Sequence, residues 1–175
     1  MSHLYYPSVT EYRLPKKNIL VISCIDLRLT DDLLNFLDFD NLTNRYDHVT
    51  LAGTSVTLGA TREEHRELFD KETLEEYDSF KHWRECLEDH IQIAINLHQI
   101  EDVYIIEHED CGAYRVFLED SSFETWEEEV ACHKKFAVAL SQEIQEEYDL
   151  HVHCFMIDIR GNVKLLDTSN VPAGS

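Results

Sequence analysis

Hydrophobic residues fall into two patterns along this chain: short continuous runs, and longer stretches in which they recur every three or four positions. The short runs occupy residues 17–23, 48–52, 103–107 and 151–159. Continuous runs of this length that are rich in β-branched residues are typical of strands buried on both faces of a parallel sheet. A tight-turn sequence follows the fourth run, so we expect residues 163–166 to return as a short antiparallel edge strand.

Stretches with helical spacing separate these runs. Thr30 and the two acids after it suit the start of a helix. The clearest amphipathic pattern begins at Ser79, and residues 122–149 predict a long amphipathic helix. Because strands and helices alternate, the sequence predicts an α/β fold. We expect a mostly parallel central sheet of four strands plus an antiparallel edge strand, flanked by helices.

The length of 175 residues suits one domain with a substantial core, so we expect a single domain over residues 1–175. Residues 1–16 are polar and irregular and predict a short N-terminal arm. The charged stretch 61–78 interrupts the alternation of runs and helices. We expect this stretch to be an insertion, either helical or a loop.

Composition narrows the classes of partner. The chain has 35 acidic and 15 basic residues, for a formal net charge of −20. A surface of this charge repels phosphate backbones and anionic membranes, so we expect no nucleic acid and no membrane as partners. No apolar run approaches the roughly 20 residues that span a bilayer. Five cysteines, an odd number, favour free or metal-bound thiols in a reducing compartment, and we expect a cytoplasmic protein.

Two short motifs carry the candidate chemistry, and each follows a predicted strand. Cys24–Arg28 follows the first run, and His108–Gly112 follows the third. Parallel strands end at the same edge of a sheet, so Cys24, His108 and Cys111 are expected to meet there. Gly53 ends the second run at the same edge. Two thiolates and one imidazole form a three-ligand zinc set with one coordination position open, which is typical of a catalytic zinc.

Asp26 and Arg28 alternate with Cys24 on an extended segment, so all three side chains can point to one side. A carboxylate at this position can accept a hydrogen bond from a metal-bound water, and an arginine can hold that carboxylate bidentately. Gly112, directly after Cys111, permits close approach of the backbone, and a helix beginning there would direct N–H groups at an anion.

Structural interpretations compete with these roles. Cys24 alone would more often be a buried core thiol, and the Asp26–Arg28 pair could be a structural ion pair. A phosphatase-type nucleophile at Cys24 is disfavoured, because the loop lacks glycines and Thr30 stands where the arginine is needed. Cys86 and His90 share a helix face, where core packing is the favoured explanation.

The two motifs, Cys24-x-Asp26-x-Arg28 and His108-x-x-Cys111-Gly112, together resemble those of the β-class carbonic anhydrases. The resemblance covers roughly residues 17–168. It implies Zn²⁺ on Cys24, His108 and Cys111, with Asp26 and Arg28 as the catalytic dyad. It also implies that Gly53, in a segment similar to the family's Ala-Gly segment, and Gly112 line the substrate site.

The activity implied by the resemblance is that of a carbonic anhydrase-like zinc lyase: reversible hydration of CO₂ to bicarbonate by a zinc-bound hydroxide. A homodimer or higher homo-oligomer, with the site near the subunit interface, is also implied. The chain departs from the family pattern in its short arm, in Leu27 between Asp26 and Arg28, in Glu107 before His108, and in the 61–78 stretch. Two other functions stay open: a zinc hydrolase of the same fold acting on CS₂ or COS, and a non-catalytic zinc-binding or assembly protein in which Asp26 closes the zinc site.

Overall fold

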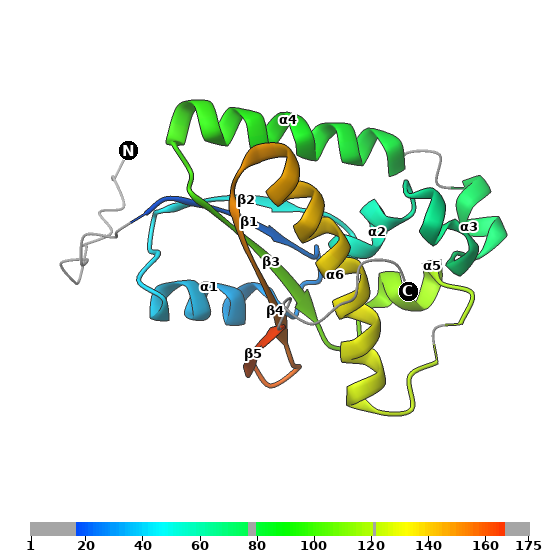
Figure 1. Cartoon of the computed structure of the whole chain (residues 1–175). Helices are drawn as coiled ribbons and strands as arrows, with labels where there is room; N and C mark the ends of the chain where they lie inside the picture. Colours follow the sequence, from blue (N-terminus) through cyan, green and yellow to red (C-terminus); the bar gives the residue numbers. More distant parts are fainter. Residues whose placement is uncertain (1–16, 77–79, 121, 167–175) are drawn as a thin grey trace, which may run out of the picture.

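The structure, a computed structural model, describes residues 17–76, 80–120 and 122–166 (Figure 1). The predicted arm at 1–16 and the end of the 61–78 stretch lie outside the described residues. A five-stranded sheet forms the centre, in the order β2-β1-β3-β4-β5. Four strands are parallel, as predicted: β1 (Ile19–Ser23), β2 (Tyr46–Thr50), β3 (Asp102–His108) and β4 (His151–Ile157), and β5 (Val163–Leu166) pairs antiparallel to β4.

Helices cover both faces of the sheet (Figure 1). On one face, α1 packs Leu33 and Leu37 against side chains of β1 and β3. On the other, α4 and α6 contribute Leu87, Ile91 and Ile144 to a second apolar cluster. The helices are α1 (Thr30–Phe39), α2 (Ser55–Gly59), the 3₁₀ helix η1 (Glu63–Leu68), α3 (Lys71–Glu76), α4 (Phe80–His98), α5 (Gly112–Phe117) and α6 (Trp126–Tyr148). The predicted α/β architecture is therefore confirmed.

Several predicted boundaries differ from the structure by one to four residues, among them those of the long helix and the second strand. The long helix begins at Trp126 rather than at residue 122, because Thr125 and Glu128 form a capping box: the Thr125 side chain accepts from the Glu128 N–H, and the Glu128 side chain accepts from the Thr125 N–H. The second strand occupies Tyr46–Thr50, two residues earlier than predicted. Its register with β1 pairs Ile19 with Tyr46, and the chain turns at Gly53 with φ of +79°.

The charged stretch 61–78 is mostly helical over its described part. It contains η1 and α3, and its first residues are joined to α6 by an ion pair between Arg62 and Glu143 (2.8 Å). Phe69 pairs by an isolated β-bridge with Leu118, at the end of α5. The stretch thus packs beside the segment that follows Cys111. In the part of the chain that the structure describes, no helix combines the length and apolar character needed to cross a membrane.

Candidate metal site

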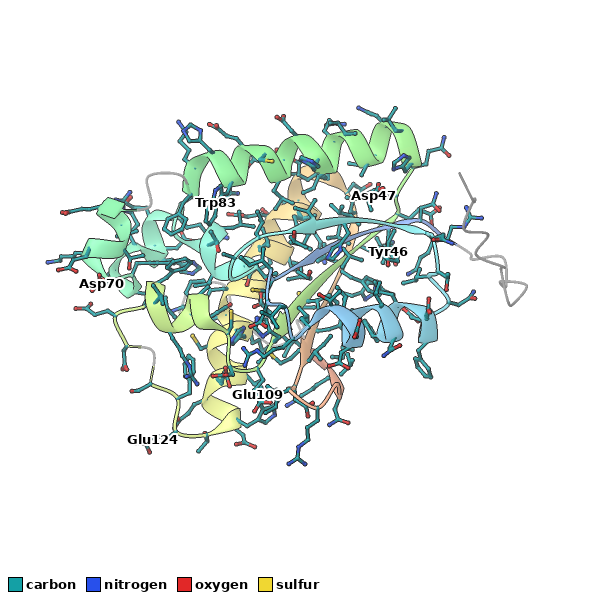
Figure 2. The ribbon with its side chains drawn as sticks, turned by 180° about the vertical axis from the view of Figure 1, so that it is seen from behind. Tyr46, Asp47, Asp70, Trp83, Glu109 and Glu124 are labelled. Carbon is teal, nitrogen blue, oxygen red and sulfur yellow. The ribbon has the colours of Figure 1, made fainter. Side chains whose placement is uncertain are left out.

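The structure places Cys24, His108 and Cys111 together at the carboxyl edge of the sheet. Cys24 follows β1, His108 is the last residue of β3, and Cys111 immediately precedes α5. Strands β1 and β3 are neighbours in register, so their ends lie side by side. The candidate ligand atoms of the three side chains all lie within 4.8 Å of one another, and all three residues are buried. Figure 2 labels Glu109 at this edge, with Tyr46 and Asp47 near the opposite one.

The geometry and the donor types fit a zinc ion. The two Sγ atoms are 4.0 Å apart, and a tetrahedral site with Zn–S bonds of about 2.3 Å separates two sulfurs by about 3.8 Å. Nδ1 of His108 lies 2.9 Å from the carbonyl oxygen of Glu109. Because a carbonyl only accepts, Nδ1 carries the proton and Nε2 keeps its lone pair. Nε2 is buried and has no hydrogen-bond partner among the described residues, as a metal-binding nitrogen requires.

Electrostatics at the two thiols favour one negative charge. The hydrogen bond with Cys111 lowers the pKa of Cys24 to about 4, against the opposing effect of burial, with help from His108 and the Gly53 amide. The pKa of Cys111 is raised by its hydrogen bond to Cys24 and by burial. A bound cation would favour the deprotonated form of both side chains, since only thiolates ligate metals.

Gly53 has a structural role at the site. Its N–H donates a hydrogen bond of 3.3 Å to Sγ of Cys24. A Cβ at this position would lie 2.6 Å from the Cβ of Ala113 and 2.6 Å from Cγ1 of Val56. Because φ is also +79°, only glycine fits without strain.

Gly112 is in a different environment. It is the first residue of α5, and apart from its chain neighbours and the backbone of its own helix, no described atom lies within 4 Å of the position a Cβ would occupy. Close approach of the backbone to another part of the described chain therefore does not account for glycine at this position. Its part in lining a substrate site stays a prediction.

Asp26 and Arg28 form a bidentate ion pair beside the three candidate ligands. Nε of Arg28 donates to Oδ1 of Asp26 at 3.0 Å, and Nη2 donates to Oδ2 at 2.7 Å. The backbone N–H of Arg28 also donates to Oδ1, at 2.9 Å. Hydrogen bonding from Arg28 lowers the pKa of Asp26 to about 2. Oδ2 lies 4.0 Å from Nε2 of His108, so Arg28 holds an ionised carboxylate next to the candidate ligands.

Asp110 is a further member of the site that the sequence did not single out. Its carboxylate accepts from Nη1 of Arg28 at 2.8 Å, and its backbone carbonyl accepts from Nη2 at 2.9 Å. It also forms an ion pair with Arg115. Asp110 lies in the turn between His108 and Cys111 with φ of +58°, a conformation that aspartate tolerates better than most residues. The arginine is therefore fixed between the two motifs.

Exposed apolar side chains lie on several of the segments that carry the site. Ile25 and Leu27 alternate with the Asp26–Arg28 pair and are 64% and 88% exposed. Val116 of α5 and Ile159, after β4, are also more than half exposed. A small cavity of about 20 Å³ lies between Arg28, His108 and Ile159, which is close to the minimum volume that holds one water molecule.

The architecture defines the class of the fold: it is that of the β-carbonic anhydrases. The β-carbonic anhydrase CafD of Aspergillus fumigatus superposes with a TM-score of 0.53, covering 89% of this chain and 92% of that one at 11% identity. No family model matches the chain.

Sequence relatives are found in Rickettsia. An uncharacterized protein of Rickettsia conorii is 28% identical over 152 residues, or 86% of this chain and 73% of the relative. An uncharacterized protein of Rickettsia bellii is 26% identical over 152 residues, covering 86% of this chain and 82% of the relative. The structural similarity to CafD, at 11% identity, shows the fold alone.

Proposed function

We propose that this protein is a zinc lyase of the β-carbonic anhydrase type that hydrates CO₂ reversibly to bicarbonate. The observation that carries the proposal is the position of the Asp26 carboxylate. It lies 4.0 Å from Nε2 of His108 and is held there by Arg28, beside two thiols and an imidazole that can hold a metal ion. Three protein ligands with a carboxylate alongside suit an open, catalytic zinc site.

Each residue of the site has a role in this proposal. Cys24, His108 and Cys111 would hold Zn²⁺, which acidifies a water molecule and so provides a nucleophile near neutral pH. The carboxylate of Asp26 accepts a hydrogen bond from water in the site and fixes its orientation towards CO₂. Arg28 keeps that carboxylate ionised and at its place, so that Asp26 orients water rather than binding the metal.

The two glycines support the same site. The Gly53 N–H stabilises the thiolate of Cys24 through its hydrogen bond. Gly112 opens α5 next to Cys111 without a side chain, and we propose that it lines the path of the substrate.

We also propose that the protein acts as a homodimer. Ile25, Leu27, Val116 and Ile159 are exposed apolar side chains on segments next to the candidate ligands, and exposed apolar groups that form one surface commonly mark contacts between subunits. Burying them against a second copy would shield the site from bulk solvent and strengthen its electrostatics. The five cysteines are free thiols, which suits a single domain working in the reducing cytoplasm.

Stopped-flow CO₂ hydration by the zinc-loaded protein tests the activity. It should be followed from about pH 6.5 to about 9, the range in which metal ions of this type acidify water. We expect hydration well above the buffer rate. A rate no better than buffer over the whole range would contradict the proposal. Sulfide release from COS without CO₂ hydration would identify the hydrolase alternative instead.

A further inference from the structure

A buried carboxylate lies directly behind the candidate metal site. Glu107 precedes His108 on β3 and is 1% exposed. Neighbouring residues of a strand point to opposite faces, so the side chain of Glu107 points away from that of His108. A carboxylate in the interior is tolerated only where donors compensate its loss of water.

Three donors surround this carboxylate. Oε1 of Glu107 accepts from the backbone N–H of Ser55 at 3.2 Å and from the Ser55 hydroxyl. Oε2 lies 2.8 Å from Nδ1 of His133, which is fully buried on α6. The carboxylate thus joins three elements of the fold: the end of β3, the start of α2 and the middle of α6.

The segment after Cys111 is tied to the same group. The ring of Tyr114, on α5, stacks on the ring of His133 with centroids 3.6 Å apart and planes at 25°. The Tyr114 hydroxyl is 3.3 Å from Oγ of Ser55. Tyr114 is fully buried, so α5 is fixed in rotation relative to Glu107.

A second acid, this one on α6, contacts the turn between His108 and Cys111. Glu129 lies one helical turn before His133, and its Oε1 accepts from the backbone N–H of Asp110 at 2.6 Å. Asp110 stands between His108 and Cys111 in the sequence. Helix α6 therefore contacts the turn through Glu129. Through His133 it also contacts Glu107 before the turn and Tyr114 after it.

Ser55 links the carboxylate to the remaining ligand. It is the first residue of α2 and follows the turn at Gly53, whose N–H bonds Sγ of Cys24. Fixing Ser55 therefore also fixes the donor to Cys24. Every ligand segment thus connects to Glu107 or Glu129, and the Cys24 segment does so through the chain from Gly53 to Ser55.

We propose that Glu107, His133 and Glu129, here called the polar brace, are positioning residues that hold the metal site in its binding geometry. The inference rests on the metal site of the proposed function. Hydrogen bonds constrain direction as well as distance, so the polar brace fixes the orientation of the ligands and not only their proximity. Hydrogen-bonded groups that support ligands in this way typically change metal affinity by about 10- to 100-fold when they are replaced.

The test compares metal binding in four proteins: the wild type, Glu107→Gln, a double variant Glu107→Leu with His133→Leu, and Ile144→Ala. Glutamine keeps the shape of Glu107 but cannot accept from Ser55 and His133 together. The double variant replaces a buried polar pair with apolar residues, which often preserves stability. Ile144→Ala is the matched control, since it weakens α6 packing in the other part of the core. Zn²⁺ affinity is measured by competition with a chromophoric chelator, and the ligand field by the visible spectrum of the Co²⁺-loaded protein.

We expect Glu107→Gln and the double variant to bind Zn²⁺ about tenfold or more weakly and to give altered Co²⁺ spectra. The Ile144→Ala variant should keep the affinity and spectrum of the wild type despite a lower melting temperature. Wild-type affinity and spectrum in either folded brace variant would overturn the inference while leaving the proposed function standing. A wild type that binds neither metal would overturn both, and the two failures are thereby distinguished.

Discussion

Arg28 holds the carboxylate of Asp26 with three N–H groups, two from its side chain and one from its backbone, at 2.7 to 3.0 Å. The same guanidinium group also donates to Asp110, between His108 and Cys111. The arginine is thereby shared by the two motifs that the sequence separates by some eighty residues. This arrangement keeps a carboxylate ionised beside the candidate metal position and leads to the first prediction.

Replacing Arg28 with lysine should lower CO₂ hydration by about tenfold or more while leaving the zinc content unchanged. An ammonium group is a point charge and cannot reproduce the planar contacts to Asp26 and Asp110 together. The matched control is Arg160→Lys, at an exposed arginine in the turn after β4, which should keep wild-type activity. Steady-state rates alongside zinc analysis check the prediction, and full activity in Arg28→Lys would count against the role assigned to Arg28.

Replacement by serine should change the zinc content at one cysteine and leave it unchanged at another. Cys111→Ser should lose zinc, because a serine hydroxyl is a far poorer zinc ligand than a thiolate. The core packing favoured for Cys86 and His90 was wrong, because both residues are exposed on α4. Cys86→Ser should therefore retain about one zinc ion per chain, as the wild type does. Zinc is measured by atomic emission after dialysis. Equal zinc content in the two variants would remove Cys111 from the ligand set.

Removing zinc should lower the melting temperature. A ligand at about 100 times its Kd stabilises the folded state by about 2.7 kcal/mol. For a domain of this size, each kcal/mol corresponds to about 2–4 °C. We therefore expect the melting temperature to fall by about 5–10 °C after chelation and to recover when Zn²⁺ is added. A melting temperature indifferent to chelator and zinc would mean that the folded protein holds no such ion.

The two glycines of the site should differ in how strongly substitution by alanine destabilises the protein. Gly53→Ala should destabilise the protein by about 2–4 kcal/mol, since it combines a positive φ with Cβ contacts at 2.6 Å. Gly112→Ala should change the free energy of unfolding by less than about 1 kcal/mol, because nothing lies near its Cβ position. Urea unfolding of the metal-free proteins measures both. Similar losses in the two variants would show that the tight packing around Gly53 is not what requires glycine.

Much of the fold followed from the sequence because its signals are local. The strands are continuous apolar runs, and parallel strands must end at one edge, so the meeting of Cys24, His108 and Cys111 could be predicted from position alone. The early start assigned to α6 was wrong because apolar spacing does not mark a helix end as sharply as the capping box at Thr125.

The remaining features depend on contacts that the sequence does not encode locally. Glu107 and His133 are 26 residues apart and on different elements, and only packing of α6 on β3 brings them to 2.8 Å. Asp110 becomes the second partner of Arg28 because the turn before Cys111 places its carboxylate there. Neither pair has a spacing or periodicity that would single it out.

The central claim is that Arg28 keeps Asp26 beside the metal position and off the metal. A crystal structure of the zinc-loaded protein measures this directly, as the distance from the ion to the nearest Asp26 oxygen. We predict zinc on Cys24, His108 and Cys111, the Asp26–Arg28 hydrogen bonds intact, and both Asp26 oxygens outside bonding distance. An Asp26 oxygen at about 2.0–2.2 Å from the zinc, with Arg28 released, would contradict the account and favour a closed, non-catalytic site.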